Sequence, residues 1–140
     1  MFEFLTEYRT KKLETEELPY SRTDLQPVLS KETLEYHYDS LAKGYAKRYN
    51  NNEGDKEFNY AGWFLHEIYF SQFEKPNDSS VPNGPVLNLI KRRFGWWQDF
   101  KEKFKEEAMK IQGSGWIYVT YDGDIKTIEN HEVQIGRAHV

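Results

Sequence analysis

The spacing of apolar residues changes once along this sequence, and that change constrains the fold more than any single motif. Up to about residue 111, apolar residues recur at intervals of three and four, the period of one face of an α-helix. Beyond that point, the runs 116–121 and 125–129 are rich in β-branched and aromatic residues, and they flank Asp122 and Gly123. An Asp-Gly pair favours a tight turn between antiparallel strands. The sequence therefore predicts helices first and a β-hairpin last.

Four helical segments are expected ahead of the hairpin. Ser30 is a good N-cap, and Glu32 places a carboxylate in the first turn of the first helix. A breaker-rich loop, residues 50–59, leads to the second helix, and because a short loop joins them the two helices should form an antiparallel pair. A third helix should close at Gly95, and a fourth should follow from Trp97. The expected helix faces are Leu34, His37, Leu41, Tyr45 and Arg48 in the first helix and Trp63, His66, Phe70 and Phe73 in the second.

The clearest linker is PNDSSVPNGP, residues 76–85. A chain of 140 residues that is 38% hydrophobic can bury one core or two small ones. We therefore expect an α+β protein, with an N-terminal antiparallel helical hairpin domain over residues 1–77 and a surface arm in its first 17 residues. Residues 78–85 should link it to an α/β domain of two helices and a β-hairpin at 86–140.

The composition excludes several kinds of chemistry. The sequence has no cysteine, which excludes disulfides, thiolate metal sites, iron–sulfur clusters and cysteine nucleophiles. A net charge of −4 with mixed signs argues against a duplex nucleic-acid binder, which needs a concentrated basic surface. No apolar run approaches the roughly 20 residues that span a bilayer, and the N-terminus lacks the apolar core of a signal peptide. We expect a cytoplasmic protein with no nucleic-acid or membrane partner.

Two histidines fall on the expected helix faces. His37 and Tyr45 are eight residues apart on the first helix, and His66 lies on the apolar stripe of the second. In an antiparallel helix pair, both imidazoles can point into the shared core. Each is then either a buried histidine satisfied by a hydrogen bond or one of two ligands to a metal ion. The Glu-x-x-His signature of di-iron bundles is absent at both positions.

A basic and aromatic segment, residues 91–105, has a composition that suits single-stranded nucleic acid. Its aromatic residues nevertheless keep helical spacing, which favours a core face opposite a solvated charged face. Residues 113–116, GSGW, are too short for a phosphate loop and lack its lysine, so a turn between helix and strand is favoured there.

Taken together, these segments resemble the iron/manganese superoxide dismutase family. Residues 18–37, LPYSRTDLQPVLSKETLEYH, are similar to the family's N-terminal signature, and residues 58–70, FNYAGWFLHEIYF, to its second helix. Residues 92–110 resemble the helix that precedes the C-terminal α/β domain, and GSGW resembles the opening of that domain. The resemblance implies that His37 and His66 are the first two metal ligands. It also implies one Mn or Fe ion per chain in the complete protein, with superoxide as the small-molecule substrate.

The resemblance implies roles for four further residues. Tyr45 would stand at the substrate funnel, linked through water to the metal-bound solvent, and Trp116 would form part of the apolar wall around the metal. Gly62 falls where iron-type members often place a glutamine and manganese-type members a glycine. In manganese-type members the outer-sphere hydrogen-bond donor comes from the strand region, and His131 stands near that place. The pattern leans toward manganese or a site that tolerates either metal.

The sequence also departs from the family. The usual histidines four and five residues after the first ligand are Leu41 and Ala42 here, and Phe70 replaces a usual tryptophan. The family's later Asp-x-Trp-x-x-His motif, which supplies the third and fourth ligands, does not occur before Val140. The tail QIGRAHV, residues 134–140, resembles nothing in the family and has the look of an appended segment.

We therefore expect a C-terminally truncated superoxide dismutase with an incomplete α/β domain. Two imidazoles alone make a weak site, so the isolated chain should have little activity. The resemblance implies a homodimer or tetramer at full length. The alternative is a non-catalytic superoxide-dismutase-like interaction or structural module, and a binder of single-stranded nucleic acid is a distant third.

Overall fold

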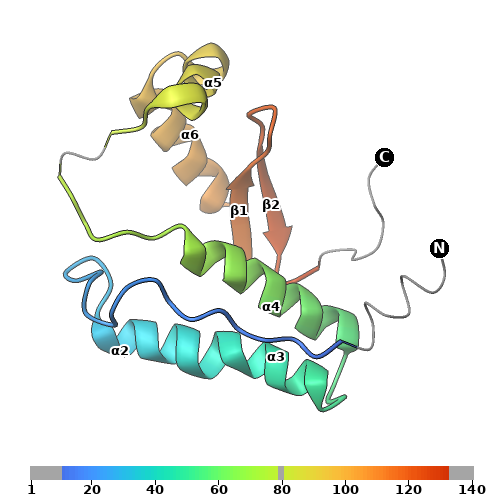
Figure 1. The fold of residues 1–140 in the computed structure, drawn as a ribbon. Coiled ribbons are helices and arrows are strands. Elements are labelled where there is room, and N and C mark those ends of the chain that lie inside the picture. Colours follow the sequence, from blue (N-terminus) through green and yellow to red (C-terminus); the bar gives the residue numbers. More distant parts are fainter. Residues whose placement is uncertain (1–10, 79–80, 133–140) are drawn as a thin grey trace. The chain divides into compact units, whose positions relative to one another are not determined.

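The computed structural model describes residues 11–78 and 81–132. Within these ranges the order of elements, shown in Figure 1, is α2 (Lys31–Leu34), the π-helix η1 (Glu35–Ala42), α3 (Lys43–Asn50), α4 (Lys56–Ser71), α5 (Gly84–Phe94), α6 (Trp97–Ala108), β1 (Gly115–Val119) and β2 (Ile125–Glu129). Helices followed by an antiparallel strand pair confirm the predicted α+β class. The chain divides into two compact units, the first with the described residues up to Pro76 and the second with those from Asn77. None of the helices in the described ranges is long and apolar enough to cross a membrane.

One continuous helix runs through α2, η1 and α3, because Leu34 and Ala42 at the junctions keep right-handed helical backbone angles. Ser30 caps this helix as predicted: its side chain accepts a hydrogen bond from the Thr33 amide at 3.1 Å. A short loop then reverses the chain, and α4 packs against α3 (Figure 1). This pair is the expected helical hairpin.

The second helix begins earlier than predicted. Asp55 is extended, and its carboxylate accepts a hydrogen bond from the Phe58 amide at 2.6 Å. An N-cap of this kind satisfies an amide that has no partner within the helix, so α4 starts at Lys56. The predicted loop 50–59 is therefore too long at both ends, since α3 includes Asn50.

The buried face of the first helix differs from the predicted one. Its buried residues recur at intervals of four and then three: Leu34, Tyr38, Ala42, Ala46 and Tyr49. Leu41, which was expected on this face, is 39% exposed. The cause is η1, because i→i+5 hydrogen bonding puts more residues in each turn than the α-helical period assumes. The face therefore drifts by one position, and His37 and Tyr45 lie half-buried at its edge.

The segment 11–17 lies on the surface, as predicted, with most of its residues exposed, and hydrogen bonds attach it to the helical hairpin. The Asn50 side chain accepts a hydrogen bond from the Leu13 amide and donates one to the Leu13 carbonyl, each at 2.8 Å. Trp63 donates its indole N–H to the Glu14 carbonyl at 2.9 Å. Side chains of the hairpin thus satisfy the extended backbone. The rest of the predicted arm lies outside the described residues.

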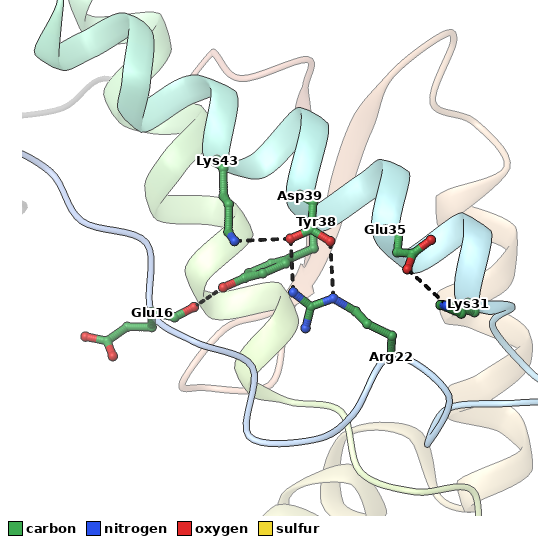
Figure 2. Close-up of polar contacts among 7 residues, drawn as sticks. All are labelled: Glu16, Arg22, Lys31, Glu35, Tyr38, Asp39 and Lys43. Carbon is green, nitrogen blue, oxygen red and sulfur yellow. Dashed lines mark hydrogen bonds and ion pairs between the residues drawn. The ribbon is translucent and has the colours of Figure 1, made fainter.

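A charged cluster over Tyr38 joins Arg22, which follows that segment, to the first helix (Figure 2). Arg22 donates from Nε and Nη2 to the two carboxylate oxygens of Asp39 at 3.2 and 3.0 Å, and Lys43 Nζ lies 3.1 Å from Asp39 Oδ1. The hydrogen bond from Arg22 lowers the pKa of Asp39. Both cations lie over the Tyr38 ring, each 4.8 Å from its centroid. Burial raises the pKa of Tyr38 to about 12, and its hydroxyl donates to the Glu16 carbonyl.

The core of the first unit lies beneath this cluster. Its fully packed members are Leu25, Leu34, Tyr38, Ala42 and Phe70, and the partly buried residues against them are Leu18, Tyr20, Leu29, Tyr69 and Phe73. The Tyr20 hydroxyl donates to the Phe70 carbonyl at 2.8 Å and so gives a hydrogen-bond partner to a carbonyl group in the last turn of α4.

The second unit begins with α5 and α6. Helix α5 starts at Gly84, two residues before the predicted start, and ends as predicted before Gly95, whose φ of 89° suits glycine. Phe100 is 8% exposed and contacts the rings of Phe94 and Phe104 at centroid distances of 5.2 and 5.6 Å. These aromatic side chains form a core, which argues against a nucleic-acid stacking surface.

The β-hairpin has the predicted strands in antiparallel register, with Trp116 opposite Ile128. Its turn is longer than a two-residue turn. The Gly123 amide donates to the Thr120 carbonyl at 2.9 Å, and Gly123 has a φ of 92°. Gly123 thus occupies the bulge position after a turn, where a left-handed conformation is required.

Candidate metal centre

The imidazoles of His37 on η1 and His66 on α4 meet in the first unit. Their Nε2 atoms are 3.1 Å apart, and the rings are perpendicular with centroids 5.0 Å apart. His66 is 4% exposed, whereas His37 is half-buried. Helix pairing thus brings together two residues that are 29 positions apart in the sequence.

Hydrogen bonding fixes the tautomer of His66. Its Nδ1 lies 2.6 Å from the carbonyl oxygen of Gly62, one turn earlier in α4. A carbonyl oxygen only accepts, so Nδ1 carries the proton and Nε2 of the neutral ring has a lone pair. That lone pair points at His37 Nε2. Metal-binding histidines commonly have this arrangement, in which the second nitrogen donates to a carbonyl group.

The two nitrogen atoms are close enough to share one ion. A divalent first-row metal holds an imidazole nitrogen at about 2.1 Å, so two such ligands of one ion are at most roughly 4.2 Å apart. The observed separation is 3.1 Å. In residues 11–78 and 81–132, no cluster of three or more His, Cys, Asp or Glu residues suited to a metal ion occurs. The described part of the chain therefore offers two convergent donors.

Aromatic rings surround the imidazole pair. Tyr69 and Phe70 lie 5.3 and 5.0 Å from His37 between ring centroids, and Phe70 also stacks on His66 at 6.2 Å. Burial lowers the pKa of His37. The neutral form that burial favours is the form that binds metal ions. Phe70, which replaces the family's tryptophan, keeps an apolar wall in contact with both imidazoles.

Tyr45, on α3, contacts one member of the imidazole pair, His66. Its ring stacks on His66, with centroids 5.3 Å apart and an angle of 29° between the planes. A Cβ atom on Gly62 would lie 2.5 to 2.7 Å from three atoms of this ring. Gly62 therefore both orients His66 through its carbonyl group and leaves room for Tyr45. Burial raises the pKa of Tyr45, against an opposing effect of Arg48, so the phenol keeps its proton.

The two positions that lack the family's histidines have different environments. Leu41 is 39% exposed, and Ala42 is 2% exposed within the core of the first unit. A larger polar side chain at Ala42 would have to displace core residues. The core of the first unit therefore has no room for a histidine at position 42. At position 41 a histidine would lie at the surface.

Trp116 and His131, predicted as separate site residues, contact one another in the second unit. The Trp116 indole N–H donates to His131 Nδ1 at 3.0 Å, and His131 is 8% exposed. An indole nitrogen only donates, so the proton of the neutral His131 ring is on Nε2. Burial lowers the pKa of His131, which favours this neutral ring. The structure thus groups His37, His66 and Tyr45 in one unit and pairs Trp116 with His131 in the other.

Sequence reasoning missed two residues beside Tyr45. Arg48 was placed on the helix face without a role, and Asn59 was assigned to a loop. In the structure the guanidinium carbon of Arg48 lies 4.8 Å above the Tyr45 ring centroid, and Nε donates to Asn59 Oδ1 at 3.1 Å. The spacing of Tyr45 and Arg48 at i, i+3 is the one signal in the sequence that pointed to this contact.

Comparison with known proteins gives two family matches. The model for the alpha-hairpin domain of iron/manganese superoxide dismutases matches residues 12–58, and the model for their C-terminal domain matches residues 82–139. The second match ends at residue 139 and so extends into the tail 134–140.

Individual relatives agree with the family models. The chain is 32% identical over 132 residues to a superoxide dismutase [Fe] of Bacteroides fragilis, with 81% of this chain and 68% of the relative covered. It is 33% identical over 138 residues to a superoxide dismutase [Mn/Fe] of Porphyromonas gingivalis, with 85% and 71% covered. A superoxide dismutase [Fe] of Sulfolobus acidocaldarius is 30% identical over 149 residues, with 86% and 71% covered. The chain therefore belongs to the iron/manganese superoxide dismutase family.

Proposed function

We propose that His37 and His66 bind an Mn or Fe ion that catalyses the disproportionation of superoxide. When bound, such an ion supplies one-electron redox chemistry, by which one superoxide is oxidised to oxygen and a second, with two protons, is reduced to hydrogen peroxide. The observation that carries the proposal is the 3.1 Å separation of the two Nε2 atoms, with His66 oriented by the Gly62 carbonyl group. Family membership and the Fe and Mn/Fe names of the relatives support it.

Three further residues have supporting tasks in this proposal. Tyr45, held against His66, keeps a phenolic proton close to the centre and helps to deliver protons to the product. Trp116 shapes the apolar wall, and His131 is an outer-sphere hydrogen-bond donor. The support for the last role is the contact with Trp116, which leaves the proton of the neutral ring on Nε2.

Metal binding by the chain tests the proposal directly. We expect wild-type protein to bind Mn²⁺ or Fe²⁺ at one site, and we expect His37→Ala and His66→Ala each to weaken the affinity at least tenfold. Lys47→Gln is the matched control, since Lys47 is an exposed residue of α3. Calorimetric titration measures the affinities. Unchanged metal affinity in either histidine variant would refute the assignment.

Catalysis is tested by completing the ligand set. Two imidazoles leave most of an ion's coordination positions open. We expect superoxide consumption to rise when the family's Asp-x-Trp-x-x-His motif is supplied in a chain extended with the corresponding segment of a relative. The same extension on a His66→Ala chain should remain inactive.

One observation favours a second function, a non-catalytic interaction or structural module. Leu41 and Ala42 stand where the family usually has two histidines after the first ligand, and Ala42 is packed in the core. Metal bound tightly by an extended chain that leaves superoxide untouched would select this second function.

We further propose a cytoplasmic protein that assembles as a homodimer or tetramer, as the family resemblance implies. Light scattering of the extended chain would give the mass of the assembly. A monomer at micromolar concentration would contradict it.

A further inference from the structure

Arg48 is held in place by a buried amide. Its Nε donates to Asn59 Oδ1 at 3.1 Å, and Asn59 is 3% exposed. The other end of the amide group, Nδ2, donates to the Glu53 carbonyl at 2.8 Å. Both polar atoms of the Asn59 side chain are therefore used, and the orientation of the amide is determined by its two partners.

The guanidinium group so held lies over the Tyr45 ring, with its central carbon 4.8 Å from the ring centroid. Two glycines leave the space for this arrangement. A Cβ on Gly44 would lie 3.0 Å from Arg48 Nη1, and a Cβ on Gly62 would lie 2.5 Å from the nearest Tyr45 ring atom. Arg48 and Tyr45 are three residues apart on α3, so the helix itself places the cation beside the ring.

Tyr45 in turn contacts His66. The two rings stack with centroids 5.3 Å apart and an angle of 29° between their planes. The Gly62 carbonyl group fixes one nitrogen of His66. A continuous series of contacts therefore leads from buried Asn59 through Arg48 and Tyr45 to the imidazole that faces His37.

We propose that Arg48 is a positioning residue of the metal centre, which holds the Tyr45 ring against His66 and thereby sets the orientation of that ligand. This inference rests on the proposed function of His37 and His66. Arginine suits the task because its planar guanidinium can stack on a ring while Nε donates in the same plane. Lysine has one ammonium group on a flexible stem and cannot do both.

The first readout needs no metal. In protein with isotope-labelled histidine, the ring protons of His66 experience the ring current of Tyr45, and their NMR signals are identified by their loss in His66→Ala. We expect Arg48→Gln to shift these signals, Arg48→Lys to shift them by less, and Lys47→Gln to leave them unchanged. Circular dichroism checks that each variant is folded. If Arg48→Gln fails to fold, Arg48→Lys carries the test.

The second readout is metal affinity. We expect Arg48→Gln to weaken Mn²⁺ binding by about tenfold, the lower end of the range for residues that support ligands from outside the coordination shell. Lys47→Gln should bind as the wild type does. A residue that only stabilised α3 would change the denaturation midpoint and leave both the His66 signals and the affinity as they were, and that result would overturn the inference.

The two proposals fail differently. If wild-type protein binds no metal ion, the proposed function fails, while the His66 signals of metal-free Arg48→Gln still decide whether Arg48 positions the ring. If wild-type protein binds metal and Arg48→Gln has wild-type signals and affinity, the positioning role fails alone.

Discussion

Gly62 lies so close to the Tyr45 ring that a methyl group on its Cα would sit 2.5 Å from Cδ1 of the tyrosine. The same glycine accepts the hydrogen bond that orients His66. One residue without a side chain thus connects the ligand helix α4 to the tyrosine on α3. The absence of a Cβ there is a requirement of the packing.

Gly62→Ala should therefore destabilise the first unit and displace Tyr45. Overpacking of this kind costs about 1–3 kcal/mol, which outweighs the gain of about 1 kcal/mol in helix propensity. Urea unfolding measures the change. Gly44→Ala is the comparison variant and should destabilise the unit less, because its Cβ would come no closer than 3.0 Å to any atom, the nearest being Arg48 Nη1. A Gly62→Ala protein more stable than wild type would contradict the observed packing.

The pair of Arg22 and Asp39 should couple more strongly than an ordinary surface pair. Arg22 makes two hydrogen bonds to the carboxylate, and the side chains are 27% and 35% exposed. A double-mutant cycle with alanine should give a coupling of about 1 kcal/mol, the upper end for partly exposed pairs.

Figure 2 also contains the control for this cycle. Lys31 and Glu35 lie 3.6 Å apart, with side chains 50% and 45% exposed. Their coupling should be about 0.3 kcal/mol, as for other i, i+4 pairs. Equal coupling energies for the two pairs would show that the two hydrogen bonds from Arg22 make this pair no stronger than an ordinary surface pair.

Trp116→Phe should alter the protonation of the His131 ring nitrogens. The change removes the N–H group that donates to Nδ1 at 3.0 Å, and a buried acceptor left without this donor costs about 1 kcal/mol or more. Nitrogen NMR should show the proton of the neutral ring moving from Nε2 toward a mixture of both nitrogens. Trp97→Phe, which keeps a ring against Phe100, is the control and should leave the His131 signals unchanged.

Thr120→Val should raise the pKa of Asp122 toward its ordinary value. The Thr120 hydroxyl donates to Asp122 Oδ1 at 2.5 Å, and this hydrogen bond lowers the pKa. Because the folded-state pKa is lowered, the stabilisation is present above the ordinary pKa of aspartate, about 3.9, and is lost as the pH falls through the lowered value.

Carboxyl NMR titration measures this shift. Thr127→Val, at an exposed residue of β2, is the matched control and should leave the pKa of Asp122 unchanged. An Asp122 pKa that stays low in Thr120→Val would assign the shift to the turn backbone instead of the hydroxyl.

Local signals in the sequence determined several elements of this protein. Ser30 begins the first helix, Gly95 ends α5, and the strands on either side of Asp122 and Gly123 pair as expected. These features depend on residues close together in the sequence, namely a cap, a left-handed glycine and the alternation of a strand. The approach of His37 to His66 was also expected from spacing, because an antiparallel helix pair brings their faces together.

Only the tertiary structure decided which atoms meet. The π-helix moved the buried face from Leu41 to Ala42, since its hydrogen-bond register depends on the packing of the whole helix. The contact of Arg48 with Asn59 needs both helices in place. The pairing of Trp116 with His131 likewise needs the folded hairpin. Periodicity specifies a face of a helix to within about one residue, whereas a contact depends on the side chain that another segment places opposite.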